Sequence, residues 1–162
     1  MCGLFHVVQR GHPVDEARLN AATDALAHRG PDARDTLVTN RTFESPDGPV
    51  AVWSGFGHRR LAILDLDPRS NQPFTRQGRT LVYNGEIYNF RHLKGQPALK
   101  DRPFTTLGDT EVLFEALASH RLELLTDMAG QWAFSFYDEA RGNTLAARDR
   151  YGKKPLFYYL DG

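Results

Sequence analysis

The sequence is poor in cysteine and balanced in charge, and both features exclude whole classes of protein. Cys2 is the only cysteine among 162 residues, so the chain can form neither an internal disulfide nor a thiolate metal site. Lys and Arg number 20, and Asp and Glu also number 20, so the formal net charge is zero. Without a basic surplus the chain lacks the field that attracts nucleic acids or anionic membranes. We therefore expect neither as a partner.

Long apolar runs and nucleotide-binding motifs are missing as well. No run approaches the roughly 18 apolar residues of a membrane span, and the N-terminus lacks the charged and apolar segments of a signal peptide. We therefore expect a cytoplasmic protein. There is no P-loop, and Gly55-Phe56-Gly57 lacks the third glycine of a dinucleotide-binding loop. The six histidines show no metal-ligand spacing, so we predict no metal site.

The spacing of apolar residues and of Gly, Pro and Asp predicts many short strands and two longer helices. Such a composition is typical of a layered α+β domain with mostly antiparallel sheets. Asp109 is predicted to cap the second helix, residues 138–143 to form a hairpin loop, and residues 95–103 a surface loop. The predicted helices are 15–27 and 110–120, and the predicted strands are 1–8, 37–38, 50–53, 58–63, 80–83, 131–137, 144–148 and 156–160.

Cys2 stands out because it follows the initiator Met1. A single cysteine is most often a small buried apolar residue, which is the simplest interpretation. If Met1 is removed, however, Cys2 carries a thiol and an α-amine together, and the amine can act as the general base that activates the thiol. With Met1 attached, the Cys2 nitrogen is an amide and cannot act in this way.

Two further groups of polar residues allow a structural or a chemical interpretation. Asn84-Gly85 is typical of a type I′ hairpin turn, but an Asn amide and a following backbone N–H can also form an oxyanion hole. Arg60 and Asp109 can be a solvated charge and a helix cap. Alternatively, a guanidinium binds an α-carboxylate and a carboxylate binds an α-ammonium, so the pair would recognise a free amino acid.

Seven motifs in the same order resemble the glutamine-hydrolysing domain of asparagine synthetases. This is a class II glutamine amidotransferase domain with an N-terminal nucleophile hydrolase fold, and the resemblance covers nearly the whole chain. The motifs are Met1-Cys2-Gly3-Leu4-Phe5, His28-Arg29-Gly30-Pro31-Asp32, His58-Arg59-Arg60-Leu61-Ala62-Ile63, Asn71-Gln72-Pro73-Phe74, Tyr83-Asn84-Gly85-Glu86-Ile87-Tyr88-Asn89, Gly108-Asp109-Thr110-Glu111-Val112 and Arg148-Asp149-Arg150-Tyr151-Gly152-Lys153-Lys154-Pro155-Leu156.

The resemblance implies a role for each matching residue. The thiol of Cys2 would attack the side-chain amide of L-glutamine, and Asn84 with the Gly85 N–H would hold the oxyanion. A glutamyl thioester would form as ammonia leaves, and water would then release glutamate. The α-carboxylate and α-ammonium groups of glutamine would be held by residues of three segments, namely Arg60, Leu61, Ala62, Ile63, Leu64, Glu86 and Asp109. The segment 28–32 would frame the site, although a structural turn explains it equally well.

The resemblance also sets expectations for what the chain does not contain. Relatives carry a synthetase domain that uses ATP and Mg²⁺ and whose pyrophosphate loop begins Ser-Gly-Gly, a tripeptide that these 162 residues lack. We therefore expect residues 1–162 to be a cofactor-free glutaminase domain without its last strands, which supplies ammonia to a separate or missing synthetase for asparagine-type synthesis. His6 stands where many relatives carry a small residue, so packing behind the nucleophile strand is expected to differ.

Two other functions remain open at this point. The chain could be a non-catalytic glutamine-binding remnant or regulatory module that acts through a partner chain. It could also keep the fold and hydrolyse another γ-glutamyl amide. Arg60 and Asp109 argue against the second alternative, because together they would select a free amino-acid head group.

Overall fold

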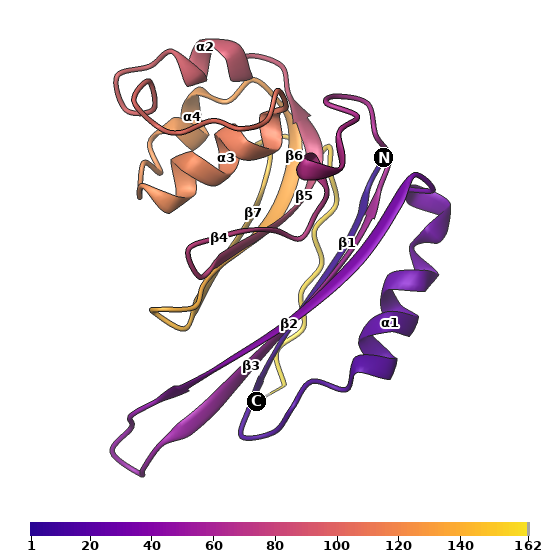
Figure 1. Cartoon of the computed structure of the whole chain (residues 1–162), viewed down its shortest axis with the longest axis vertical. Helices are drawn as coiled ribbons and strands as arrows, with labels where there is room; N and C mark the ends of the chain where they lie inside the picture. Colours follow the sequence, from indigo (N-terminus) through magenta and orange to yellow (C-terminus); the bar gives the residue numbers. More distant parts are fainter. Residues whose placement is uncertain (162) are drawn as a thin grey trace.

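The computed structural model describes residues 1–161 and arranges them in layers (Figure 1). Two antiparallel sheets face each other, helix α1 covers the outer face of one sheet, and α2, α3 and α4 lie over the outer face of the other. The first sheet has the order β1-β3-β2 and the second β4-β5-β6-β7. The predicted α+β fold with layered antiparallel sheets is therefore confirmed.

The bounds of the elements follow the chain in order. The strands are β1 (Gly3–Arg10), β2 (Ala33–Phe43), β3 (Val50–Arg60), β4 (Phe74–Arg76), β5 (Arg79–Ile87), β6 (Gly130–Asp138) and β7 (Asn143–Arg148). The helices are α1 (Glu16–Ala25), α2 (Phe90–Lys94), α3 (Asp109–Ala118) and α4 (Leu124–Asp127), with two short 3₁₀ turns at Ala27–Arg29 and Pro68–Ser70.

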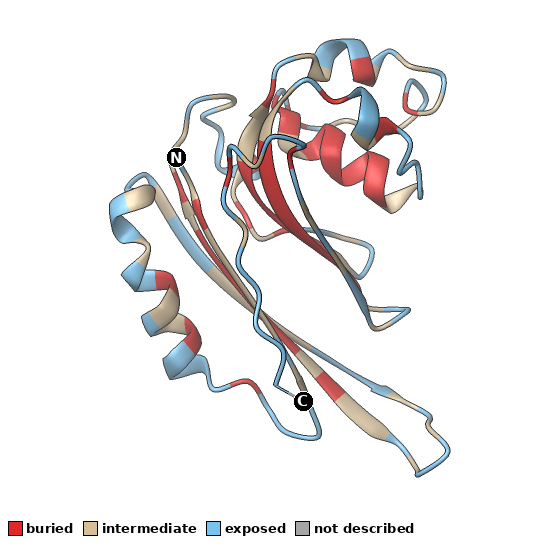
Figure 2. Cartoon of the chain, turned by 180° about the vertical axis from the view of Figure 1, so that it is seen from behind, coloured by how far each residue is buried: buried red, intermediate tan, exposed pale blue. Residues whose placement is uncertain are grey.

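Two apolar cores hold the layers together. The larger core lies between the second sheet and its helices, where α3 and β5 are buried along most of their length (Figure 2). The smaller core lies between the sheets and contains Phe56, Val82 and Tyr137. His6 stacks on Phe56 with ring centroids 4.2 Å apart and lies 2.7 Å through Nδ1 from the Ser135 hydroxyl. The histidine therefore takes part in the packing behind the first strand.

Strand β3 is longer than the sequence pattern predicts. The separate strands predicted at 50–53 and 58–63 are one strand, which pairs with β2 from Phe43↔Val50 to Ala33↔Arg60. Gly57 interrupts the apolar pattern because α1 packs on this face of the sheet. A Cβ atom at Gly57 would lie 1.9 Å from Thr23 Oγ1, so a larger residue does not fit.

Strand β5 also continues where the sequence pattern suggests an end. Asn84 and Gly85 lie within β5 and pair with Ala133 and Trp132 of β6, so the hairpin-turn interpretation is wrong. Gly85 is required by close approach of the two strands, since a Cβ atom there would lie 2.4 Å from the backbone oxygen of Gln131. The tertiary pairing with β6 thus overrides the local turn preference.

The last predicted strand, residues 156–160, is not a strand. No ladder partner pairs with it among residues 1–161, and it forms an extended segment whose side chains are largely exposed from Phe157 to Leu160. Residues 95–103 form turns after α2, as predicted for a loop, but Leu99 within them is fully buried in the larger core.

Residues 1–161 contain neither a helix suited to span a membrane nor a cluster of side chains suited to bind a metal. Across the described residues, no helix combines the length and the apolar character needed to cross a membrane. Within the same residues, no group of three or more His, Cys, Asp or Glu side chains is arranged to hold a metal ion.

Candidate active site

Cys2 immediately precedes β1 and is held by two segments that are distant in sequence. Its Sγ atom accepts a hydrogen bond from the Leu61 backbone N–H at 3.4 Å and lies 3.8 Å from the Leu61 oxygen. Its backbone oxygen accepts a hydrogen bond from Arg29 Nε at 3.0 Å. The thiol is therefore fixed next to the chain that leaves β3, and its side chain is half-buried.

The segment 28–32 supports this arrangement directly. Besides the contact of Arg29 with Cys2, the Asp32 carboxylate accepts a hydrogen bond from the Ala62 N–H at 2.8 Å. The Asp32 N–H in turn donates to the Arg60 backbone oxygen at 3.0 Å. This segment thus ties Cys2, at the start of β1, to the backbone at residues 60–62 and is more than an isolated turn.

A cavity of about 150 Å³ opens beside Cys2. Nine of the ten predicted site residues line it, whereas Ala62 does not and instead points its N–H at Asp32. The cavity is lined by Met1, Cys2, Arg60, Leu61, Ile63, Leu64, Gln72, Tyr83, Asn84, Gly85, Glu86, Asp109, Thr110, Gln131 and Lys154. Residues from both ends of the chain and from both sheets therefore meet around one volume.

The Gly85 N–H lies on an open edge of β5. Alternate residues of a strand direct their N–H groups to the same side. On that side the Tyr83 N–H donates to Gln72 Oε1 at 2.6 Å and the Ile87 N–H donates to Asp109 Oδ2 at 2.8 Å. The Gly85 N–H lies between these two and has no acceptor among residues 1–161, since β4 pairs only as far as Leu81.

The Asn84 side chain provides a second free donor. It is only 5% exposed and lines the cavity, yet its amide makes no hydrogen bond to another described residue. The amide is not among the fully enclosed polar groups that lack a partner, so it stays accessible to a ligand or water in the cavity. Asn84 and Gly85 together therefore offer two N–H groups to an oxygen atom bound in the cavity.

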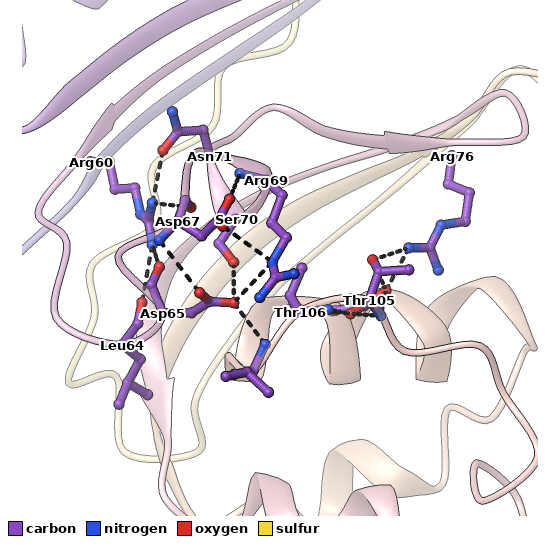
Figure 3. Close-up of polar contacts among 12 residues, drawn as sticks. Arg60, Leu64, Asp65, Asp67, Arg69, Ser70, Asn71, Arg76, Thr105 and Thr106 are labelled. Atoms are coloured by element: carbon purple, nitrogen blue, oxygen red, sulfur yellow. Dashed lines mark hydrogen bonds and ion pairs between the residues drawn. The ribbon is translucent and has the colours of Figure 1, made fainter.

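Arg60 lines the cavity at the end of β3, but most of its guanidinium is occupied (Figure 3). Nη1 donates to Asn71 Oδ1 at 2.8 Å and to the Asp67 oxygen at 3.3 Å, and Nη2 donates to the oxygens of Leu64 and Asp65. Four of the five N–H groups of a guanidinium are thus used, which leaves the one at Nε. A carboxylate on a ligand would accept a hydrogen bond from the Arg60 Nε–H. If it also bound an Nη atom, it would displace one of the hydrogen bonds that this atom now makes.

The acceptors around Arg60 are all neutral. Within residues 1–161, no carboxylate oxygen lies within 4.0 Å of its guanidinium, although the residue is only 6% exposed. A buried cation without a counter-ion is unfavourable, so the site favours an anionic group on a bound ligand.

Asp109 is the complementary buried anion. It is the first residue of α3, whereas the helix N-cap is Gly108, so the predicted capping role is wrong. Its Oδ2 atom accepts hydrogen bonds from the Tyr83 hydroxyl at 2.7 Å and from the Ile87 N–H at 2.8 Å. The carboxylate therefore binds two groups of β5.

The electrostatics of Asp109 favour a cationic ligand. Burial raises the pKa of this carboxyl group, the hydrogen bonds from Ile87 and Tyr83 partly oppose the rise, and the charge of Glu86 adds to it. Among the described residues, no Lys, Arg or His nitrogen lies within 4.0 Å of the carboxylate. An ammonium group in the cavity would supply the missing positive charge.

Comparison with known proteins identifies this arrangement. The sequence model of the family described as "Glutamine amidotransferase domain" matches residues 1–162. The chain belongs to this family. Both the family and the enzyme class predicted from the sequence are thereby confirmed. The relatives of this amidotransferase domain are long proteins, and the chain spans about a third or less of their length.

Three relatives with different names are similar in sequence to this chain. Asparagine synthetase (glutamine-hydrolysing) 3 of Bacillus subtilis is 32% identical over 100% of this chain and 25% of its own length. A Methanocaldococcus jannaschii protein provisionally named as a glutamine-hydrolysing asparagine synthetase is 33% identical over 100% of this chain and 32% of its own length. Amidase chry2 of Gibberella zeae is 37% identical over 86% of this chain and 20% of its own length.

Several residues of the amidotransferase cavity escaped the sequence analysis. Gln72 and Lys154 lie in motifs that carry the resemblance, but nothing in their spacing indicated that they reach the site. Tyr83 precedes Asn84, and its hydroxyl donates a hydrogen bond to Asp109. Gln72 lies in the segment between β3 and β4 and reaches the Tyr83 N–H of β5 through its side chain, a contact for which local sequence carries no signal.

Proposed function

We propose that this amidotransferase domain hydrolyses L-glutamine to glutamate and ammonia with Cys2 as the nucleophile. The observation that carries the proposal is the composition of one cavity. A thiol, two unpartnered N–H donors, a buried cation and a buried anion line the same 150 Å³. Glutamine presents an electrophilic amide, a carbonyl oxygen, a carboxylate and an ammonium group, which match these features one by one.

The chemistry follows from these groups once Met1 is removed. The Cys2 α-amine takes the proton of the thiol, and Sγ forms a bond to the amide carbon. The carbonyl electrons move to the oxygen, which accepts hydrogen bonds from the Asn84 amide and the Gly85 N–H. The carbon–nitrogen bond then breaks, the α-amine returns the proton to the leaving nitrogen, and ammonia departs. Water attacks the glutamyl thioester, releases glutamate and restores the thiol.

Arg60 and Asp109 would bind the two charges of the amino acid. The Arg60 Nε–H would bind the α-carboxylate, while the free Oδ1 of Asp109 would accept hydrogen bonds from the α-ammonium. Glu86 adds negative charge beside Asp109. Leu61, Ile63 and Leu64 would contact the substrate from the segment after β3.

We further propose that the ammonia passes to a synthetase part that lies on a longer protein or on a partner chain. Two of the three relatives carry asparagine synthetase in their names, and each is at least three times as long as this chain. ATP and Mg²⁺ would serve that synthetase part, and residues 1–162 would act as the glutaminase domain. The amide product formed there would be of the asparagine type.

The test starts with the intact mass of the purified chain, which shows whether Met1 is removed. Glutamate release from glutamine is then measured for the wild type and for Cys2→Ala, which we expect to be at least about 10³-fold slower because the nucleophile is lost. An electrophilic glutamine analogue is expected to add once, at Cys2, and excess glutamine is expected to block the adduct. N-acetylglutamine, which lacks the ammonium group, serves as the poor-substrate control.

Two outcomes would contradict the proposal. Hydrolysis that is unchanged in Cys2→Ala would exclude Cys2 as the nucleophile. Protection by glutamine without any turnover, in a chain that has lost Met1, would instead support the non-catalytic glutamine-binding module.

A further inference from the structure

The C-terminal motif 148–156 has no role in the chemistry described so far, although several hydrogen bonds hold its backbone in place. The Asp149 carboxylate is 4% exposed and accepts four backbone hydrogen bonds, from Trp132 at 3.2 Å, Tyr151 at 3.1 Å, Lys153 at 3.0 Å and Lys154 at 2.9 Å. It thereby fixes the loop after β7 to β6. The result is a rigid support for Lys154, whose backbone is held directly.

Lys154 is buried at the wall of the cavity, where a lysine is unusual. It is 5% exposed, and its Nζ atom lies 2.9 Å from the Met1 sulfur. No carboxylate lies within 4.0 Å of Nζ among residues 1–161. Lysine side chains are almost never fully buried unless they are paired, and a thioether is a weak partner. An ammonium group buried without a counter-ion is unfavourable, so folding stability does not explain a lysine in this position.

The position of Met1 places this charge close to the N-terminal residue of the processed chain. Five bonds separate the Met1 sulfur from the Cys2 nitrogen, so standard bond lengths put Lys154 Nζ within roughly 10 Å of that nitrogen. The other charged or titratable groups around Cys2 come from four segments and are Arg29, Arg60, Tyr83, Glu86 and Asp109. Among the described residues, Lys154 makes the polar contact to the Met1 sulfur.

We propose that Lys154 is a positioning residue that keeps the Cys2 α-amine unprotonated after removal of Met1. The ammonium charge of Lys154 disfavours a second positive charge at the nearby amine. The unprotonated amine can then accept the proton of the Cys2 thiol and later return it to the departing nitrogen. Lys154 itself exchanges no proton and forms no bond in the reaction. This inference rests on the proposed glutaminase function.

Lys154→Met provides the first test, in the pH dependence of kcat/KM for glutamine. At an effective dielectric constant of about 20, a unit charge at the upper limit of roughly 10 Å shifts a titration by about one pH unit. We therefore expect the acid limb of the profile to move about one unit to higher pH, with the rate at the alkaline plateau within about twofold of the wild type. Lys154→Arg keeps the charge and is expected to restore the wild-type limb.

Lys153→Met is the matched control, because Lys153 is the exposed neighbour with the same charge. It is expected to leave the limb unchanged. An acid limb unmoved by Lys154→Met would overturn the proposal. A raised KM with an unmoved limb would also overturn it and would assign Lys154 to binding of the substrate carboxylate.

A second measurement does not depend on activity. In the Cys2→Ala variant the N-terminal amine is labelled with ¹⁵N and titrated by NMR, with and without Lys154→Met. We expect its midpoint to lie about one unit lower when Lys154 is present, and also lower than in a peptide of the first ten processed residues. Equal midpoints in the protein and the peptide would overturn the proposal even if the Lys154 variants do not fold. A chain that shows the shift but never hydrolyses glutamine would refute the proposed function alone.

Discussion

At the scale of single residues, the cavity is defined by two opposite charges that lack partners. Arg60 and Asp109 are each 6% exposed, and neither forms an ion pair within the described chain. Buried charges are usually paired, because desolvation penalises an isolated one. On the proposed function, a zwitterionic ligand would supply both missing charges at once.

Replacement of Asp109 by Asn tests this explanation. The variant keeps an acceptor for Tyr83 and Ile87 but loses the charge, so we expect KM for glutamine to rise about 10- to 100-fold while kcat changes much less. In the wild type KM is expected to rise on acidification as Asp109 becomes protonated, starting above the usual carboxyl range because burial raises this pKa. Steady-state kinetics between pH 4.5 and 8 measure both effects.

Asp101→Asn is the control, because Asp101 is an exposed aspartate in the loop before α3. It should leave KM unchanged. An Asp109→Asn variant with wild-type KM at every pH would show that this carboxylate does not hold the α-ammonium group.

The sequence predicted the types of these residues but not their contacts. The resemblance placed Cys2, Asn84, Gly85, Arg60 and Asp109 in one site, and nine of the ten predicted residues do line one cavity. Their roles stay predictions until tested. The sequence could not show which distant groups these side chains contact. Asp109 was expected to cap its own helix but accepts a hydrogen bond from β5. The guanidinium group of Arg60 donates hydrogen bonds to oxygen atoms of the turn 64–71.

At the scale of elements, β5 is the strand on which the site depends. Its N–H groups at Tyr83, Gly85 and Ile87 point to one open edge, where side chains satisfy the first and the last. The sequence analysis ended this strand at residue 83 because Asn84-Gly85 is typical of turns, just as it divided β3 at its glycines. In both strands a glycine is needed because another element of the fold packs closely against it. The local sequence pattern does not show which distant element that is.

Gly85→Ala tests the close approach of β5 and β6. The added methyl group would lie 2.4 Å from the Gln131 oxygen and 2.6 Å from the Trp132 Cα atom, both of which are backbone atoms that cannot turn away. We expect the free energy of unfolding to fall by roughly 2 kcal/mol or more, measured by urea denaturation. Activity should fall as well, because the Gly85 N–H moves.

Gly95→Ala is the matched substitution without a clash. Gly95 has helical backbone angles, and its added Cβ atom would meet the His92 oxygen at an ordinary 3.5 Å. Its stability should stay within about 0.5 kcal/mol of the wild type. If the two variants were equally stable, the strand-packing explanation of Gly85 would be wrong.

At the scale of the whole molecule, two histidines lie on the first sheet where it faces the second. His58 is buried and His6 is half-buried, and each has one inaccessible ring nitrogen without a partner among residues 1–161. Burial lowers the pKa of each to about 4, and for His58 the hydrogen bond to the Tyr83 oxygen partly opposes this effect. The contact between the sheets therefore depends on both rings being neutral.

The fold should consequently lose stability in mild acid. Below pH 6.5 the unfolded chain binds protons at these histidines, whereas the folded chain binds them only near pH 4, so unfolding becomes easier as the pH falls. Between pH 6.5 and 5 the loss is expected to be about 1.5 kcal/mol for each histidine. Urea denaturation at several pH values measures it.

His6→Gln isolates one contribution, because glutamine can still bond Ser135 but does not titrate in this range. The variant should lose roughly half of the pH dependence, whereas His12→Gln, at an exposed site, should behave like the wild type. Unaltered pH dependence in His6→Gln would locate the acid sensitivity elsewhere.

The open edge of β5 has one more consequence. The Gly85 N–H and the Ile87 N–H that carries Asp109 are two residues apart, which in a strand is roughly 6–7 Å. On the proposed chemistry, these points receive the amide oxygen and, through Asp109, the ammonium group of the same molecule. The spacing of these two N–H groups along β5 would therefore select ligands by the distance between their amide oxygen and their ammonium group. On the same proposal asparagine, which is shorter by one methylene group, would reach either end but not both, so this spacing would favour glutamine over asparagine.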